Sequence, residues 1–281
     1  MDVSRRSLLR SSLIIGGVSA LGTDLFGTPV WAKTLKTAGT TLAQTVARGP
    51  AGAGGYAKLA TAAGEPHLVR TDLGVPAGPD REHDREPVLA FAQISDVHIV
   101  DDQSPMRVEY VDRFEDQYAA GDPTLNLLQS SYRPQEMLSA HIAESMVRAI
   151  KQIGSGPVTG APLAFTLQTG DNSDNSQYNE IRWNIDLLDG GKQIVPDSGN
   201  LTKYEGVADN NKTYYDPHYW HPDAPPAGKS ADIAKTRWGF PTVPGLLDAA
   251  RKPFQSTGLG MEWYSAFGNH DGLVQGNFPN S

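Results

Sequence analysis

Three hydrophobic runs, each followed by a short polar cluster, stand out in the hydrophobic pattern of the chain. The runs lie at residues 88–95, 163–169 and 261–267, and their length and apolar content are typical of buried strands. The clusters that follow them are Asp96-Val97-His98, Gly170-Asp171-Asn172 and Gly268-Asn269-His270-Asp271. Open α/β sheets carry their chemistry at the carboxyl ends of parallel strands. The pattern therefore predicts one polar site assembled from three distant parts of the chain.

Segments with helical periodicity lie between these hydrophobic runs. Apolar residues recur at helical spacing from Met137 to Ile153, Pro134 suits the first turn, and Gly154 and Gly156 end the pattern. A second helix is predicted at about 177–188, before Gly190-Gly191, and a short one near 243–250. The order strand, helix, strand, helix is typical of βαβ units, so we expect an α/β fold with a parallel sheet.

The remaining segments show little periodicity. Residues 33–64 are rich in Ala, Gly and Thr, and residues 65–87 carry clustered charge, so 33–87 is predicted to be a flexible lead-in to a domain at 88–281. Two insertions are predicted in that domain, at about 99–133 and 192–241. The second is rich in aromatic residues, and its Tyr214, Tyr215, Tyr219 and Trp220 either line a cleft or pack onto the domain.

The first 32 residues have the features of an export signal. Adjacent arginines, Arg5 and Arg6, precede a short apolar stretch, and Val30-Trp31-Ala32 offers small residues at a cleavage site. The paired arginines resemble a twin-arginine leader. The apolar stretch is too short and glycine-rich to span a bilayer well, so we expect cleavage after Ala32, export, and no stable membrane span in the mature protein.

Composition narrows the possible chemistry. The 281-residue chain has a formal net charge of -8, which argues against general nucleic-acid binding because no basic excess is available to neutralise phosphates. It contains no cysteine, which excludes disulfides, cysteine-based zinc sites and thiol nucleophiles. Phosphorylated substrates are still compatible with this charge if bound metal ions supply local positive charge.

The three clusters contain the ligand types of a divalent metal site. Carboxylate and amide oxygens suit hard divalent ions, and imidazole suits zinc, iron and manganese. Two such ions about 3.5–4 Å apart commonly share a carboxylate. We expect Asp96 and His98 at one ion, because strand alternation would point them to the same side, with Asp171 as the bridge and Asn269 at the second ion.

The ordered motifs D-x-H, G-D-x-x-D and G-N-H-D resemble those of the calcineurin-like metallophosphoesterases over roughly residues 88–271. The resemblance implies a β-sandwich flanked by helices (αββα), with two divalent ions, Mn, Fe or Zn. It implies hydrolysis of phosphate mono- or diesters, whether small phosphorylated molecules or phosphodiesters, by a metal-activated hydroxide. It assigns metal binding to Asp96, His98, Asp171 and Asn269. His270 would act as an acid or contact the transition state, and Asp271 would orient His270. Asp174 matches a supporting acidic position.

The chain departs from this family pattern after His270. The family completes its site with further histidines downstream, whereas this sequence has none after His270. The second ion would keep only Asp171 and Asn269, and the resemblance implies that only the N-terminal part of the domain is present. A truncated product, a protein completed by another chain and a mononuclear remnant are all compatible with this pattern. The alternative functions are an inactive or weakly metal-binding fragment and an extracellular binding module.

The other histidines are interpreted as structural rather than as replacement ligands. His218 and His221 lie in the aromatic insertion, where such a pair is more often part of a surface loop than of a metal site. His141 lies within the predicted amphipathic helix.

Overall fold

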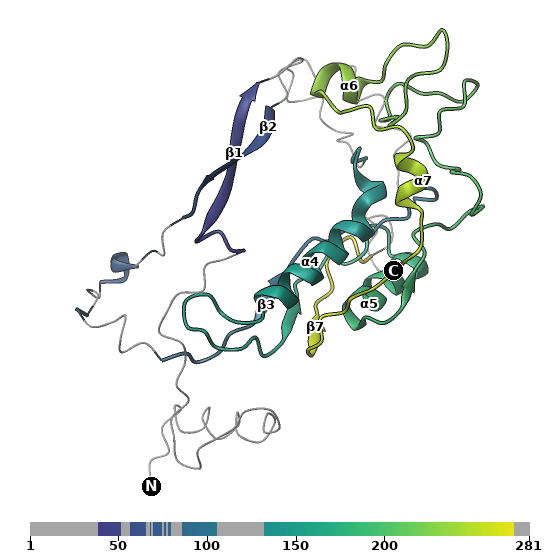
Figure 1. Cartoon of the computed structure of the whole chain (residues 1–281). Coiled ribbons are helices and arrows are strands. Elements are labelled where there is room, and N and C mark those ends of the chain that lie inside the picture. The colour runs from purple at the N-terminus through teal and green to yellow at the C-terminus, as the bar shows by residue number, and fades with distance from the viewer. Residues whose placement is uncertain are drawn as a thin grey trace.

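A computed structural model describes residues 39–51, 57–65, 68, 70–74, 76, 78–79, 86–105 and 132–272. The expected leader at 1–32 and residues 106–131 of the first predicted insertion lie outside these ranges. The described part is a mixed α/β structure with small sheets and few helices (Figure 1). None of its helices has the length and apolar character needed to cross a bilayer.

A three-stranded parallel sheet lies at the centre of the domain. It is formed by β3 (Ala92–Ile94), β4 (Thr166–Gln168) and β7 (Trp263–Ser265), in the order β3-β4-β7. The strands are in register, so their carboxyl ends lie at the same edge. The parallel sheet is therefore confirmed, although each strand is shorter than its hydrophobic run.

Two helices cover one face of this sheet (Figure 1). The short η5 (Glu136–Leu138) leads into α4 (Ser139–Ile153), and α5 (Tyr178–Asp189) follows β4, close to the predicted bounds. Gly154 ends α4 with φ 61°, a conformation that favours glycine. The apolar faces of both helices pack on the sheet in a buried cluster of Ile94, Val147, Leu188 and Leu259.

The opposite face of the sheet carries aromatic side chains with considerable exposure. Phe91 stacks on Phe165 with ring centroids 5.2 Å apart, and Tyr264 meets Phe165 edge-on.

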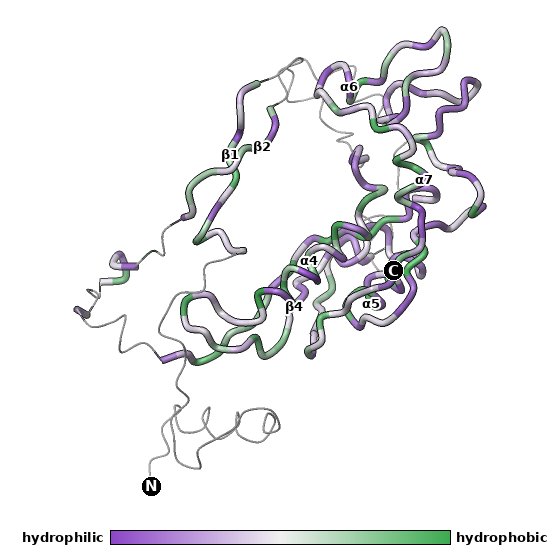
Figure 2. The backbone as a smooth tube through the Cα atoms, in the orientation of Figure 1, coloured by the Kyte–Doolittle hydropathy of each residue, from purple (hydrophilic) through white to green (hydrophobic). Residues whose placement is uncertain are grey.

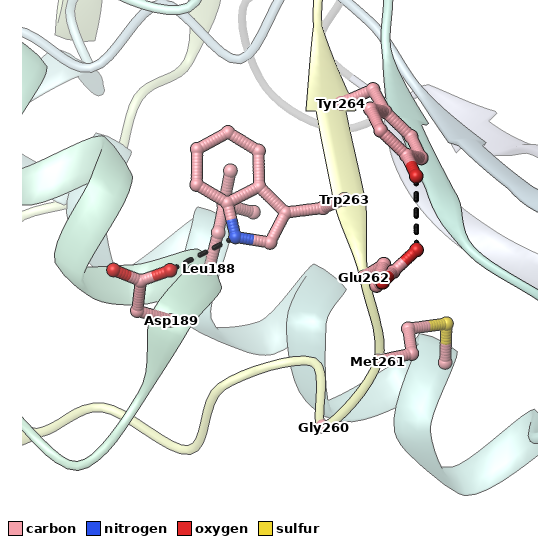
Figure 3. A pocket seen from close by; sticks show the side chains of 7 residues that line it. All are labelled: Leu188, Asp189, Gly260, Met261, Glu262, Trp263 and Tyr264. Atoms are coloured by element: carbon pink, nitrogen blue, oxygen red, sulfur yellow. Dashed lines mark hydrogen bonds between the residues drawn. The ribbon is translucent and has the colours of Figure 1, made fainter.

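An open pocket of about 630 Å³ lies where β7 begins, lined by residues 260–264 together with Leu188 and Asp189 (Figure 3). This pocket is at the amino end of β7, whereas the polar clusters follow the carboxyl ends of the strands.

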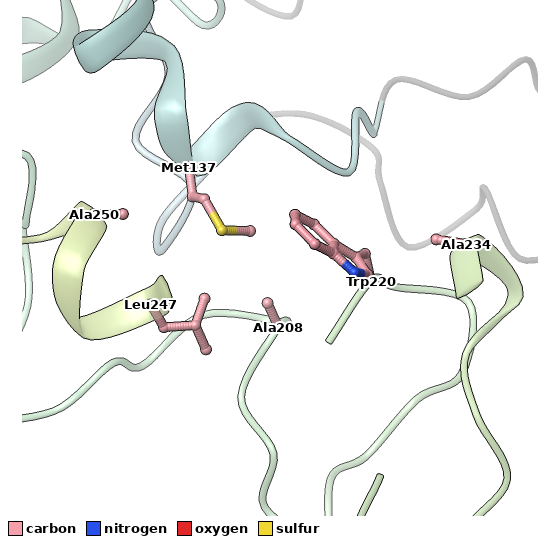
Figure 4. Close-up of a cluster of buried hydrophobic side chains, with 6 residues drawn as sticks. All are labelled: Met137, Ala208, Trp220, Ala234, Leu247 and Ala250. Carbon is pink, nitrogen blue, oxygen red and sulfur yellow. The ribbon is translucent and has the colours of Figure 1, made fainter. Parts of the chain in front are cut away.

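The aromatic insertion shares a small core with residues that precede and follow it. The insertion contains β5 (Gln193–Ile194) and α6 (Ile233–Trp238). After it come α7 (Leu246–Ala250) and β6 (Phe254–Gln255), and β6 pairs antiparallel with β5. Figure 4 shows the buried cluster, which consists of Met137, Ala208, Trp220, Ala234, Leu247 and Ala250. Tyr215 and Tyr219 are buried as well, whereas Tyr214 and Trp238 are exposed, so most of the clustered aromatic residues at 214–220 pack within the protein.

Regular structure also occurs within the predicted flexible lead-in. An antiparallel hairpin is formed by β1 (Gln44–Ala51) and β2 (Ala57–Ala63), and a single turn, η2 (Thr71–Leu73), follows. The hairpin lies apart from the central sheet (Figure 1). Hydrophobic and hydrophilic segments both occur along it (Figure 2). Most of its side chains are exposed, which explains why its sequence lacks the apolar alternation of a half-buried strand.

Candidate metal centre

The polar loops after β3 and β4 run side by side. The amide of Asp96 donates to the carbonyl of Gly170 at 3.2 Å, and the amide of His98 donates to the carbonyl of Asp171 at 2.9 Å. Asp96, His98 and Asp171 all adopt positive φ angles of 48–54°. Because β3 already ends at Ile94, the expectation that strand alternation orients positions 96 and 98 is wrong. Left-handed backbone, which Asp and His tolerate better than most residues, turns them into the site instead.

Two glycines allow the loops after β4 and β7 to touch through their backbones. Gly170 has φ 107°, and a Cβ placed there would lie 3.0 Å from the Cα of Gly268. A Cβ on Gly268 would overlap the backbone nitrogen and carboxylate of Asp171. The glycines of both motifs are therefore required by close approach as well as by a tight turn.

Three of the predicted site residues converge at this edge of the sheet. His98, Asp171 and His270 each offer a ligand atom, and these atoms all lie within 4.8 Å of one another. The Nε2 atom of His98 lies 3.8 Å from Oδ2 of Asp171 and 3.9 Å from Oδ1 of Asp96. The two imidazole rings meet edge-on, with centroids 4.4 Å apart. Within the described ranges, no other group of three histidine or acidic side chains qualifies as a metal cluster.

A single buried carboxylate, that of Asp174, contacts both imidazoles from behind. Its Oδ1 atom lies 2.9 Å from Nδ1 of His98 and 3.2 Å from Nδ1 of His270, and its side chain is fully buried. The hydrogen bond of His98 Nδ1 goes to this carboxylate, and that of His270 Nδ1 goes to the backbone carbonyl of Asp174 at 3.3 Å. Ionised carboxylates and carbonyls only accept hydrogen bonds, so both Nδ1 atoms are assigned as N–H donors. Neutral imidazoles in this tautomer carry their lone pairs on Nε2. A carboxylate behind the ring is the usual support of a metal-binding histidine.

Asp271 joins the third loop to the second. Its buried carboxylate accepts hydrogen bonds from the amides of Asn172, Ser173 and Gly268, each at 2.9 Å. The side chains of Asn172 and Ser173 donate to it as well, at 2.8 and 3.1 Å. The resemblance assigns Asp271 to the ring of His270, but its hydrogen bonds hold the loops, and the ring is held by Asp174.

The remaining predicted ligand, Asn269, lies exposed beside His270 in the same loop. The amide of His270 donates to Oδ1 of Asp171 at 2.9 Å, which places Asn269 at the rim of the cluster. His141 and His218 have other partners, the carbonyl of Ala250 and the carboxylate of Asp216 respectively. Among the described residues, donors for a full second metal site are therefore not gathered here.

His221 is also satisfied elsewhere, deep within the insertion. Its side chain is completely buried, and its two ring nitrogens face the carbonyl oxygens of Ala208 and Asp216 at 3.1 and 2.8 Å. The interpretation of His218 and His221 as structural residues agrees with these contacts.

The centre is supported by two further residues, which the sequence analysis did not pick out. Arg133 donates to Oδ1 of Asp174 from both terminal nitrogens, at 3.0 and 2.5 Å. Glu180, the third residue of α5, is fully buried and accepts the amide of Asp101 after β3 and the amide of Asn175 after β4, both at 2.9 Å. Burial raises the pKa of Glu180, against the opposing effect of these hydrogen bonds. Glu180 lies three residues after Gln177 and completes a capping box at the start of α5, and this spacing is the feature of the sequence that could have identified it.

The donor set suits one divalent ion. Metal–ligand bonds of about 2.1 Å place two ligand atoms no more than roughly 4.2 Å apart, a limit that the 3.8 and 3.9 Å separations around His98 already meet.

The scan against models of protein families and the searches of curated proteins and of solved structures found no match. The chemistry of the site is therefore inferred from its own residues.

Proposed function

We propose that this chain is a metal-dependent phosphoesterase of the calcineurin-like kind. The observation that carries the proposal is the convergence of His98, Asp171 and His270, with the buried carboxylate of Asp174 on the Nδ1 side of both rings. In this proposal the sheet β3-β4-β7, with α4 and α5 on one face, corresponds to one half of an αββα sandwich. Export through a twin-arginine leader is part of the same proposal, and cell fractionation tests it.

The residues fit a single ion held by His98, Asp171 and His270, with Asp96 as an additional oxygen ligand. A neutral imidazole that donates Nδ1–H to Asp174 presents a lone pair at Nε2, which is what a metal ion requires. This favours metal binding by His270, whereas the family resemblance gives it the role of an acid. Mixed nitrogen and oxygen donors suit manganese, iron or zinc. A second ion would rest on Asp171 and Asn269 alone among the described residues.

The bound ion would supply positive charge to a phosphoryl oxygen and lower the pKa of a bound water. The chain's own contribution is to hold the donors in place. Asp271 and the two motif glycines bring the loops together, and Asp174 fixes the ring orientations. The exposed carboxylate of Asp96 and the exposed Asn269 leave one side of the cluster open to solvent, where a phosphate mono- or diester can approach.

The test is hydrolysis of p-nitrophenyl phosphate and of its bis-ester, with added Mn²⁺ or Zn²⁺. Asp171→Asn keeps the shape of the side chain but removes the charge that the ion requires, so we expect its metal-dependent activity to be lost. Asp189→Asn is the matched control, because that exposed carboxylate also accepts a hydrogen bond, from Trp263 (Figure 3), but lines the pocket at the amino end of β7 rather than the cluster. Equal activity in the wild type and Asp171→Asn would refute the proposal.

The alternative functions give different outcomes in the same assay. A weakly metal-binding fragment shows no activity above the control without protein, even at saturating metal. A binding module built on the aromatic insertion is disfavoured, because Tyr215, Tyr219 and Trp220 are buried and Tyr214 alone among these four is exposed.

A further inference from the structure

The segment just before α4 is anchored at two points in the core of the insertion. The hydroxyl of Tyr132 accepts the amide of Trp220 at 2.9 Å, and its ring meets that of Tyr219 edge-on at 5.0 Å. Five residues further on, Met137 is buried in the cluster that contains Trp220 and Leu247 (Figure 4). The backbone between Tyr132 and Met137 is therefore held by the insertion on both sides.

Arg133 lies between these anchors and extends to the metal centre. Both of its terminal nitrogens donate to Oδ1 of Asp174, and Nη2 lies 3.4 Å from Nδ1 of His98. Its backbone is fixed locally too, since its amide donates to the carboxylate of Glu136 at 3.2 Å and its carbonyl accepts the amide of Glu136 at 3.0 Å. The guanidinium thus joins the back of the metal cluster to a segment that the insertion holds in place.

The charge of Arg133 has a consequence for both imidazoles. A carboxylate as buried as that of Asp174 is costly without a cation close by, and a guanidinium is always charged and only donates hydrogen bonds. Because the guanidinium offers no acceptor, a proton on Nδ1 of His98 is donated to Oδ1 of Asp174, at 2.9 Å. Arg133 therefore favours the arrangement in which the imidazoles direct Nε2 towards the ion.

We propose that Arg133 is a positioning residue of the metal centre, and that the insertion at 192–241 sets its place through Tyr132 and Tyr219. The insertion then acts on the site from behind, through Arg133 and Asp174, without contributing a ligand. The inference rests on the proposed function, because it requires that His98, Asp171 and His270 bind a divalent ion.

The first test measures Mn²⁺ binding to the whole chain by calorimetric titration. Arg133→Met keeps much of the side-chain volume but removes the charge, and we expect Mn²⁺ affinity to fall roughly 10- to 100-fold, as for other partners behind metal ligands. Arg133→Lys restores the charge without the two-nitrogen contact and should recover part of the loss. Thermal melts of the metal-free variants check that each one is folded.

The second test asks whether Tyr219 acts through Arg133. Tyr219→Leu removes the ring that packs on Tyr132, and we expect weaker Mn²⁺ binding in the wild-type background but no further weakening in Arg133→Met. Tyr214→Leu is the control, an exposed tyrosine of the same insertion that should leave affinity unchanged. Additive losses from Tyr219→Leu and Arg133→Met would refute the link between the insertion and the site.

The outcomes separate this inference from the proposed function. If the wild type binds Mn²⁺, Asp171→Asn does not, and Arg133→Met binds as tightly as the wild type, only the positioning role is overturned. If the wild type itself binds no Mn²⁺, the proposed metal centre fails and this inference fails with it.

Discussion

Replacing Asp271 by asparagine tests how the polar loops are held together. The carboxylate accepts five hydrogen bonds, three at Oδ1 and two at Oδ2. An asparagine that keeps its oxygen at the Oδ1 position directs its NH₂ group at the amide of Gly268 and the side-chain amide of Asn172, both of which are donors. Two hydrogen bonds to a charged group are lost, and at least the Gly268 amide keeps no acceptor, so we expect a loss of about 2–4 kcal/mol in the free energy of unfolding.

Urea denaturation measures this loss, with the free energy of unfolding extrapolated to water. Asp72→Asn is the matched control, since it makes the same chemical change at an exposed carboxylate whose ion pair with Arg70 should contribute little. Mn²⁺ affinity should fall together with stability in Asp271→Asn, because Gly268 and the neighbouring His270 move with the loop. Equal unfolding free energies for Asp271→Asn and Asp72→Asn would refute the reasoning.

Three further predictions concern the supports of the site and the domain. Gly268→Ala places a methyl group on the backbone of Asp171, and we expect a loss of about 1–3 kcal/mol in urea denaturation together with weaker Mn²⁺ binding; unchanged Mn²⁺ affinity would contradict the close approach. Asp197→Ala leaves the buried Arg251 without its main partner and should cost about 3–5 kcal/mol. Burial alone would raise the pKa of Asp197, but hydrogen bonds from Arg251 and two other donors outweigh it and hold the pKa below its usual 3.8. The stability from this group is therefore complete above about pH 4 and is lost as the pH falls through the lowered pKa, so the wild-type advantage over Asp197→Ala should shrink in acid. Glu180→Gln turns an amide NH₂ towards the backbone donor of one of the two site loops, Asp101 or Asn175, and should lower the urea midpoint, and a midpoint equal to that of the wild type would contradict the proposed support.

The sequence was sufficient to predict the parallel strands, the helices between them and the edge at which the polar clusters meet. These features depend on local pattern, namely an apolar run, a glycine and a polar cluster for each strand, and helical spacing from Met137 to Ile153. The convergence of His98, Asp171 and His270 follows once three parallel strands lie in register, because motifs after the strands then share one edge.

Other features depend on contacts between distant residues, which local pattern does not reveal. Arg133 precedes Asp174 by 41 positions, and nothing in its neighbourhood distinguishes it from a solvated arginine. Trp220 is buried against Met137 rather than exposed in a cleft, a choice made by packing. The hairpin β1–β2 escaped prediction because its mostly exposed strands need no apolar alternation.

The central claim is that His98, Asp171 and His270 together bind a divalent ion. The most direct measurement is anomalous diffraction from crystals of the protein soaked with Mn²⁺. We predict an anomalous peak within about 2.3 Å of Nε2 of His98 and of a carboxylate oxygen of Asp171, with His270 completing the set. A fully soaked crystal with no peak at this position, or with its peaks only elsewhere, would contradict the claim.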